Sequence, residues 1–169
     1  MREFSRVDAC IPLSARLVSE EEKNRIKSRI SSDLTFISSR PVDESVDNAL
    51  AEWLKMINQK IDFLINLITM QQQGFSSLPL TQVDISGGGI NFYSEYPYKT
   101  GDILELKMVL ETPSPIALYI YGEVVNCEPK DKGYRVGLKF INIDEDVRDN
   151  IVKFVFHRQR QILRQKREI

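Results

Sequence analysis

The chain has 169 residues, a formal net charge of −1 and 42% apolar residues, which is the composition of an ordinary globular domain. This balance argues against a general binder of nucleic acid. One histidine and two distant cysteines cannot supply the ligand cluster of a zinc site, so we expect no metal. No apolar run approaches the roughly 18–20 residues of a membrane span. Charged residues open the chain where a signal peptide would be apolar, so we expect a cytoplasmic protein.

The same composition argues against catalysis. A nucleophile activated by histidine would have to use His157, which lies in a basic, helix-patterned stretch rather than at a strand end. We therefore expect no enzyme, no catalytic residue and no cofactor.

The N-terminal part of the chain combines one strand-like stretch with a polar segment. Residues 7–18 form the strand-like stretch. Ser19, followed three residues later by Glu22, has the spacing of a capping box. This spacing predicts a short helix over about residues 20–30.

Residues 44–73 have the pattern of one long helix with a heptad seam. The seam residues alternate spacings of four and three: Leu50, Leu54, Ile57, Ile61, Leu64 and Ile68. A second row, interrupted by Lys60, runs beside it: Trp53, Met56, Phe63, Leu67 and Met70. This double face is broader than a two-stranded coiled coil needs. We expect a homo-oligomer through this helix, a tetramer rather than a dimer; the alternative is a helix folded against its own barrel.

From residue 78 the apolar pattern changes to period two, in short runs bounded by Gly, Pro, Asn and Asp. With the first strand, these runs predict about six strands and therefore a mainly β protein, either a sandwich or a small closed barrel. The expected strands cover residues 80–85, 90–93, 103–110, 116–125 and 134–140. A turn-like sequence at residues 128–133 joins the last two.

After residue 144 the period returns to that of a helix, whose acidic start and basic end match the helix dipole. Its cations most simply form a solvated face, and the alternatives are a docking surface for an acidic partner or an extra phosphate contact. These cations are Lys153, Arg158, Arg160, Arg164, Lys166 and Arg167. Nucleic acid is disfavoured because no aromatic residues interleave with them.

Two short motifs carry the functional argument. The first is Asp84-Ile85-Ser86-Gly87-Gly88-Gly89 at a strand end, where glycines allow positive φ and a close backbone approach. Alone it fits a glycine-rich hairpin, and it lacks the spacing of a phosphate loop. The second is the pair Arg2 and Arg6, directly before the first strand, which alone fits a solvated tail.

Together, R-x-x-x-R before a strand and D-x-S-x-x-G at a later strand end resemble the PilZ domain, the bacterial receptor module for cyclic di-GMP. The resemblance implies a PilZ-like antiparallel β-barrel formed by residues 1–18 and 78–169, with a C-terminal helix. Residues 19–77 would be a helical insertion that contains the oligomerisation helix. The implied ligand-binding residues are Arg2, Arg6, Asp84, Ser86 and Gly89.

The resemblance also implies what each residue does. The arginines would bind phosphate or guanine, because their planar fork suits both. Asp84 would accept hydrogen bonds from a guanine edge or orient an arginine, and Ser86 would bond at the same surface. We therefore expect a cyclic di-GMP receptor that signals to an unidentified partner protein; the alternative is an oligomeric scaffold that binds nucleotide weakly or not at all.

Overall fold

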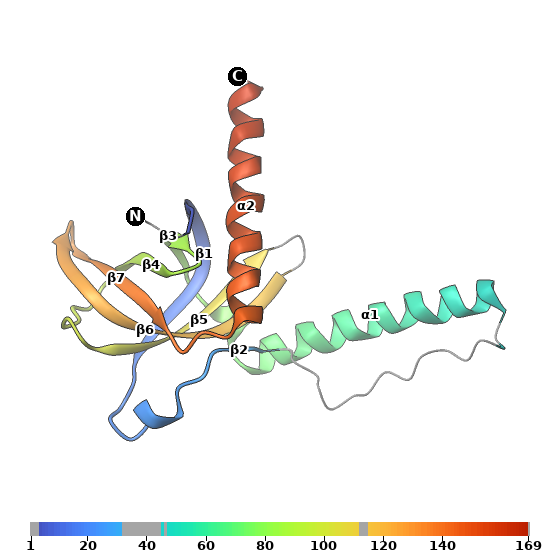
Figure 1. Ribbon diagram of the computed structural model, residues 1–169, viewed down its shortest axis with the longest axis horizontal. Coiled ribbons are helices and arrows are strands. Elements are labelled where there is room, and N and C mark those ends of the chain that lie inside the picture. Colours follow the sequence, from blue (N-terminus) through green and yellow to red (C-terminus); the bar gives the residue numbers. More distant parts are fainter. Residues whose placement is uncertain (1–3, 32–44, 46, 112–114, 169) are drawn as a thin grey trace.

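A computed structural model describes all residues except 1–3, 32–44, 46, 112–114 and 169. Its strands form one antiparallel sheet in the order β2-β6-β5-β1-β3-β4-β7, which the pairing of β6 with β7 closes into a barrel (Figure 1). In chain order the elements are β1 (Arg6–Leu17), the 3-10 turn η1 (Lys23–Arg25), β2 (Arg29–Ile30), α1 (Asn48–Gln72), η2 (Phe75–Ser77), β3 (Leu80–Ser86), β4 (Gly89–Ser94), β5 (Ile103–Glu111), β6 (Pro115–Lys130), β7 (Gly133–Ile141) and α2 (Glu145–Arg167).

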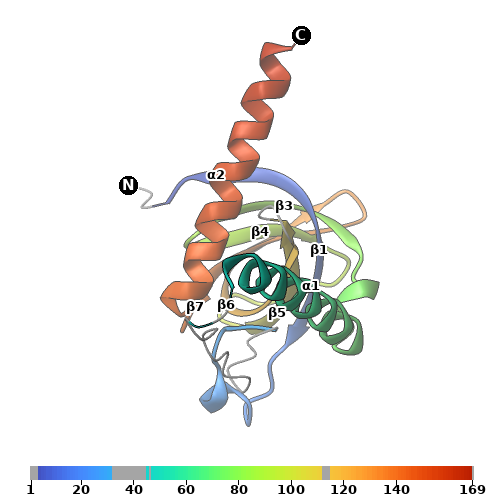
Figure 2. The ribbon, with the colours of Figure 1, turned by 90° about the vertical axis from the view of Figure 1, so that its right-hand side faces the viewer.

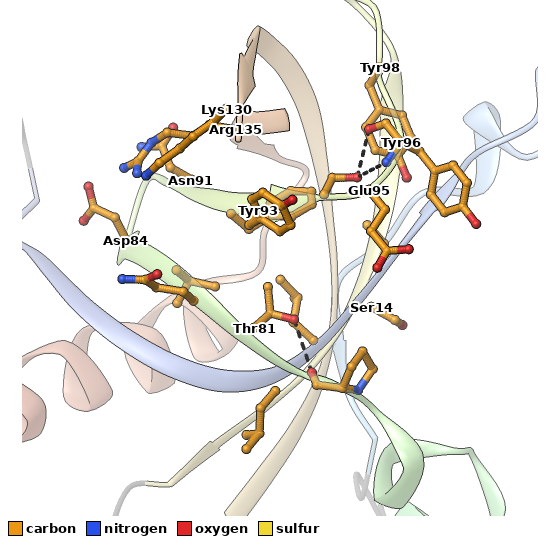
Figure 3. Close-up of a pocket in the computed structure, with 18 of the residues that line it drawn as sticks. Ser14, Thr81, Asp84, Asn91, Tyr93, Glu95, Tyr96, Tyr98, Lys130 and Arg135 are labelled. Carbon is orange, nitrogen blue, oxygen red and sulfur yellow. Dashed lines mark hydrogen bonds between the residues drawn. The ribbon is translucent and has the colours of Figure 1, made fainter. Parts of the chain in front are cut away.

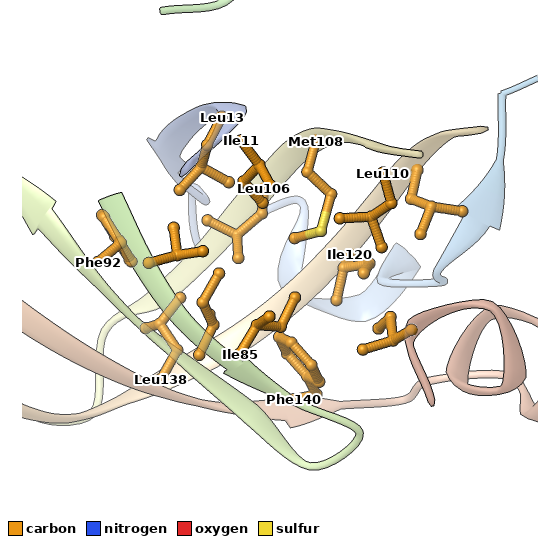
Figure 4. Close-up of a cluster of buried hydrophobic side chains, with 14 of the residues drawn as sticks. Ile11, Leu13, Ile85, Phe92, Leu106, Met108, Leu110, Ile120, Leu138 and Phe140 are labelled. Carbon is orange, nitrogen blue, oxygen red and sulfur yellow. The ribbon is translucent and has the colours of Figure 1, made fainter. Parts of the chain in front are cut away.

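The barrel forms because its strands alternate between apolar and polar residues. In β5, Leu104, Leu106 and Met108 are fully buried and point into the barrel, while Glu105 and Lys107 lie on the outer side. Figure 4 shows part of the resulting core, to which β1 and β3 to β7 contribute large aliphatic side chains. The expected fold class is confirmed: the protein is mainly β, with a six-stranded antiparallel barrel, a C-terminal helix and a long additional helix.

The C-terminal helix α2 packs on the barrel with its first half. Val147, Ile151, Phe154 and Val155 are buried in the same core as the strands. Their spacing of three to four residues leaves the opposite face of α2 exposed. The second half of α2 extends beyond the barrel (Figure 1).

The expected helix over residues 20–30 does not form. The chain makes only the short turn η1, and β2 then pairs with β6. The segment lacks the continuous apolar stripe that would hold a helix on a core, whereas β6 offers free backbone groups and Arg29 stacks 4.0 Å from the Tyr119 ring centroid. Because β2 lies within residues 19–77, part of the expected insertion joins the barrel sheet, and the division into domains stays a prediction.

The long helix α1 projects away from the barrel, in a direction different from that of α2 (Figures 1 and 2). Its only buried residue is Met70, near its C-terminal end, which packs with Phe75, Val109 and Tyr119. The heptad face is exposed along the rest of the helix. The alternative of a helix folded along its own barrel is therefore not what the chain adopts.

Strand β6 runs further than expected, because a bulge between Val124 and Asn126 lets the strand bend and continue to Lys130. The turn to β7 is then only two residues long and uses the positive φ of Asp131.

None of the helices in the described ranges has the length and apolarity needed to cross a membrane.

Candidate functional site

The two sequence motifs meet where β1 runs beside β3. Residue pairing places Arg6 opposite Ser86, and Asp8 opposite Asp84. The Arg6 Nε donates to Asp84 Oδ2 at 3.2 Å, and Arg6 Nη2 donates to the Asp84 carbonyl oxygen at 3.3 Å. Both side chains are 23% exposed, so the ion pair is formed at the surface but shielded from full hydration.

Ser86 supports the glycine turn from within. Its side chain is buried, and Oγ accepts a hydrogen bond from the Gly88 N–H at 3.2 Å and donates to the Gly89 carbonyl at 3.4 Å. These bonds fix the turn between β3 and β4. The buried hydroxyl shapes the turn, whereas the sequence had led us to expect a contact at the ligand surface.

The glycines are required for close approach and not for positive φ. Among the described glycines, only Gly74 and Gly101 have positive φ, so the expectation of positive φ in this turn is wrong. A Cβ on Gly89 would instead collide with the carbonyl oxygen of Leu138 on β7. A Cβ on Gly87 would lie 2.9 Å from the Phe4 ring. The Leu138 backbone and the Phe4 ring therefore occupy the space that a side chain at Gly89 or at Gly87 would need.

Three residues that the motifs do not include complete the site. Phe4 lies against Gly87 and Gly88, and the Arg148 guanidinium is 5.4 Å from the Phe4 ring centroid. Arg148 Nε also donates to the Gly87 carbonyl at 3.2 Å, and Gln159 Nε2 donates to the Arg6 carbonyl at 3.1 Å. The start of β1 and the glycine turn are thus both bonded to α2. Of these three residues, only Phe4 had a signal in the sequence, as an isolated aromatic residue between two arginines.

The structure brings Arg6, Asp84, Ser86 and Gly89 together on adjacent strands, as the motifs predicted. Arg2 lies outside the described residues. The six seam residues of α1, which we assigned to oligomerisation, all lie on its exposed side and take no part in this site.

A polar row continues from Asp84 across the outer face of the barrel. Strand pairing aligns Asp8, Asp84, Asn91, Gly137 and Asn126 on β1, β3, β4, β7 and β6. A Cβ on Gly137 would lie 2.5 Å from the Asn126 side-chain oxygen and 2.7 Å from that of Asn91. The amide side chains of Asn126 and Asn91 therefore occupy the space above Gly137 and give this row hydrogen-bonding groups.

A cavity of about 570 Å³ begins at this row (Figure 3). Asp84, Asn91 and Arg135 lie at one end, Tyr93 lies in the middle, and Tyr98 lies at the other end. Burial raises the pKa of the Tyr98 hydroxyl above its ordinary value. The cavity has the size of a small-ligand site, with aromatic walls and polar ends. Within the part of the chain that the structure describes, no three His, Cys, Asp or Glu side chains converge as metal ligands would.

Comparison with known proteins identifies the family. The family model of the PilZ domain matches residues 63–157, which is more than half of the chain. A solved structure of a pathogenic protein from Xanthomonas campestris, described as a tetrameric PilZ domain self-assembled through an unusual helical bundle, matches with a TM-score of 0.63 and 16% identity. The match covers 96% of this chain and 92% of that chain, and at this identity it concerns the fold alone. No curated protein matches the sequence.

Proposed function

Because the chain belongs to the PilZ domain family, we propose that it is a non-enzymatic receptor for cyclic di-GMP. The observation that carries the proposal is the Arg6–Asp84 pair beside the glycine turn, on which the Phe4 ring lies. The ligand has two phosphates, which need cationic donors, and two guanines, which need acceptors for their N–H groups and a flat surface. Arg6 supplies donors and Asp84 supplies an acceptor, and the glycine turn would supply the flat surface once the Phe4 ring moves away.

The Arg6–Asp84 pair still has bonding capacity for a ligand. A guanidinium has five N–H donors, and Arg6 uses two of them in hydrogen bonds to Asp84. Asp84 uses Oδ2 for Arg6, which leaves Oδ1 as an acceptor for a guanine edge. We assign phosphate or guanine contacts to Arg6 and Arg2, guanine recognition to Asp84, and surface shape to Ser86 and Gly89.

A second part of the proposal is assembly through α1. Ten large apolar residues of this helix are between 38% and 62% exposed in the single chain, which is costly in water. The six seam residues, Leu50, Leu54, Ile57, Ile61, Leu64 and Ile68, would pair with those of other copies. The Xanthomonas protein is described as a tetramer formed through a helical bundle, and we propose a tetramer here too.

A third part is the output. Arg148 and Gln159 bond α2 to the glycine turn and to the start of β1. A ligand that draws Arg6 or Gly87 toward itself would alter these bonds and shift α2. We propose that α2 passes nucleotide binding to a partner protein.

One observation favours the alternative of a scaffold that binds nucleotide weakly. Arg6 is already paired with Asp84, and Phe4 covers Gly87 and Gly88, so a ligand must displace contacts before it gains new ones. Isothermal titration of the protein with cyclic di-GMP separates the two functions. A receptor should bind at about micromolar affinity, or roughly −8 kcal/mol.

The titration is repeated with Arg6→Ala and Arg2→Ala. Each should weaken binding about ten- to a hundredfold, because a charge-assisted bond contributes roughly 1.5–3 kcal/mol. Arg25→Ala is the matched control, since Arg25 is exposed and lies in η1, away from the site. No binding by the wild type would support the scaffold, and equal binding by all variants would refute the site assignment.

A further inference from the structure

One stripe of exposed side chains runs along the face of α2 that points away from the barrel. Its members recur at spacings of three and four residues and alternate between a cation and an apolar group: Lys153, Phe156, Arg160, Leu163 and Arg167. We name these five residues the outer stripe. Phe156 and Leu163 are 49% and 57% exposed, whereas the barrel-facing Phe154 and Val155 are buried. The outer stripe is therefore a row of alternating cationic and apolar side chains that none of the described residues covers.

The charge around the outer stripe is one-sided. Between Asp149 and Glu168, α2 contains no acidic residue but carries six cations: Lys153, Arg158, Arg160, Arg164, Lys166 and Arg167. None of the six forms an ion pair with any residue that the structure describes. The whole chain has 23 basic and 24 acidic residues, so the remainder of the protein is clearly acidic. A concentrated positive field thus extends from an acidic body on a projecting helix (Figure 1).

We propose that the outer stripe docks an acidic amphipathic helix of a partner protein. Spacings of three and four are those of a helix that packs against another helix. Phe156 and Leu163, seven residues apart, would pack against apolar residues of the partner. Lys153, Arg160 and Arg167, also seven apart, would face carboxylates at the intervening positions of the partner. The contact would extend over about 21 Å of helix.

The positive charge of the outer stripe argues against a second copy of α2 as its partner, and the narrowness of its apolar surface argues against a membrane. A second copy of α2 would bring its own cations against these, which is unfavourable. A helix that lies in a membrane surface presents a wide apolar face, but here the apolar positions, Phe156 and Leu163, are single and separated by cations. The proposal goes beyond nucleotide binding and does not require it. Since Arg148 and Gln159 bond the inner side of the same helix to the nucleotide site, the docked helix would lie on the element that we assign to output.

The test uses a synthetic probe. A fluorescein-labelled helical peptide of about 21 residues carries Leu and Glu alternately along one stripe with the same three–four spacing. A second peptide replaces each Glu by Lys. Fluorescence anisotropy should show the wild-type protein binding the Glu peptide at least about tenfold more tightly than the Lys peptide.

Charge reversal provides the specific readout. Arg160→Glu/Arg167→Glu should lose at least about tenfold in affinity for the Glu peptide and gain affinity for the Lys peptide. Lys99→Glu/Lys132→Glu makes the same change in net charge on exposed loop residues and should behave like the wild type. Arg160→Gln/Arg167→Gln, which should leave the helix intact, is expected to lose preference between the peptides, and circular dichroism checks the helix in each variant.

Three results would overturn the proposal. The wild type could bind both peptides equally, or the charge-reversed variant could keep its preference for the Glu peptide. The protein could also ignore both peptides yet sediment with vesicles of phosphatidylcholine containing about one quarter phosphatidylglycerol. The last result would assign the outer stripe to a membrane surface.

Discussion

Replacing Ile61 by Asp places a charge in the middle of the α1 seam. In the single chain the Ile61 side chain is 46% exposed, so assembly would bury about half of it, worth roughly 1 kcal/mol. The substitution removes this term and adds the desolvation of a carboxylate, about 3 kcal/mol or more per chain. In a tetramer the change occurs four times, which totals on the order of 15 kcal/mol. The assembly should therefore dissociate to monomers at micromolar concentration.

Sedimentation velocity measures this outcome, and circular dichroism checks the fold. Ile and Asp have similar helix propensities, so α1 itself should change little. The barrel should remain folded, since its core contains no α1 residue and the smaller cluster beside it contains only Met70 from α1. Lys55→Asp is the matched control and should stay assembled, because Lys55 is exposed and its neighbours one turn away include Glu52, Asn58 and Gln59. A monomeric wild type, or an Ile61→Asp variant that still assembles, would refute the seam.

Three further predictions concern the barrel and the site. Gly89→Ala should lower the free energy of unfolding by about 2 kcal/mol or more, because the new Cβ collides with the Leu138 carbonyl. Thermal unfolding measures this loss, and an unchanged midpoint temperature would contradict it. Burial and the acceptor Glu105 raise the pKa of Tyr121 to about 12 from 10, so the folded state holds this proton more tightly than the unfolded chain. The free energy of unfolding should therefore fall as pH rises from 10 through 12, by roughly 1–2 kcal/mol, and less in Tyr121→Phe; equal slopes for both proteins would exclude this role. Phe4→Ala should speed amide exchange in the glycine turn, which this ring covers, and identical protection would mean that the ring contributes nothing.

The barrel strands could be predicted because their pattern is local. In β5 the alternation of Leu104, Leu106 and Met108 with polar neighbours has only one side that can face a core. The end of β6 could not be predicted in the same way. Its bulge at Val124 to Asn126 depends on how β6 pairs with β7, and no single-strand pattern encodes that pairing.

Prediction was weakest between residues 19 and 30. The capping-box spacing at Ser19 is a local preference worth about 1 kcal/mol. Pairing of β2 with β6 and stacking of Arg29 on Tyr119 together outweigh it. Both partners lie some 90 residues away in the sequence, so a local pattern could not show that β6 had a free edge.

The sequence predicted some features of the candidate site, and only the tertiary structure showed the others. The two motifs predicted that Arg6, Asp84, Ser86 and Gly89 would lie together, because the order of these motifs along the chain resembles that of the PilZ domain. Only the tertiary structure could decide that Ser86 is buried beneath the turn and that Gly89 is required by a carbonyl of β7.

The sequence by itself determined the secondary-structure class of nearly every element, the exposed heptad face of α1 and the identity of the motif residues. Each of these follows from the period of apolar residues or from short spacing, which are properties of neighbours along the chain. The tertiary structure alone decided that α2 reaches back to the first strand, where Arg148 meets Phe4 and Gln159 bonds Arg6. These contacts join residues more than 140 positions apart, and packing brings them together only after the barrel has closed.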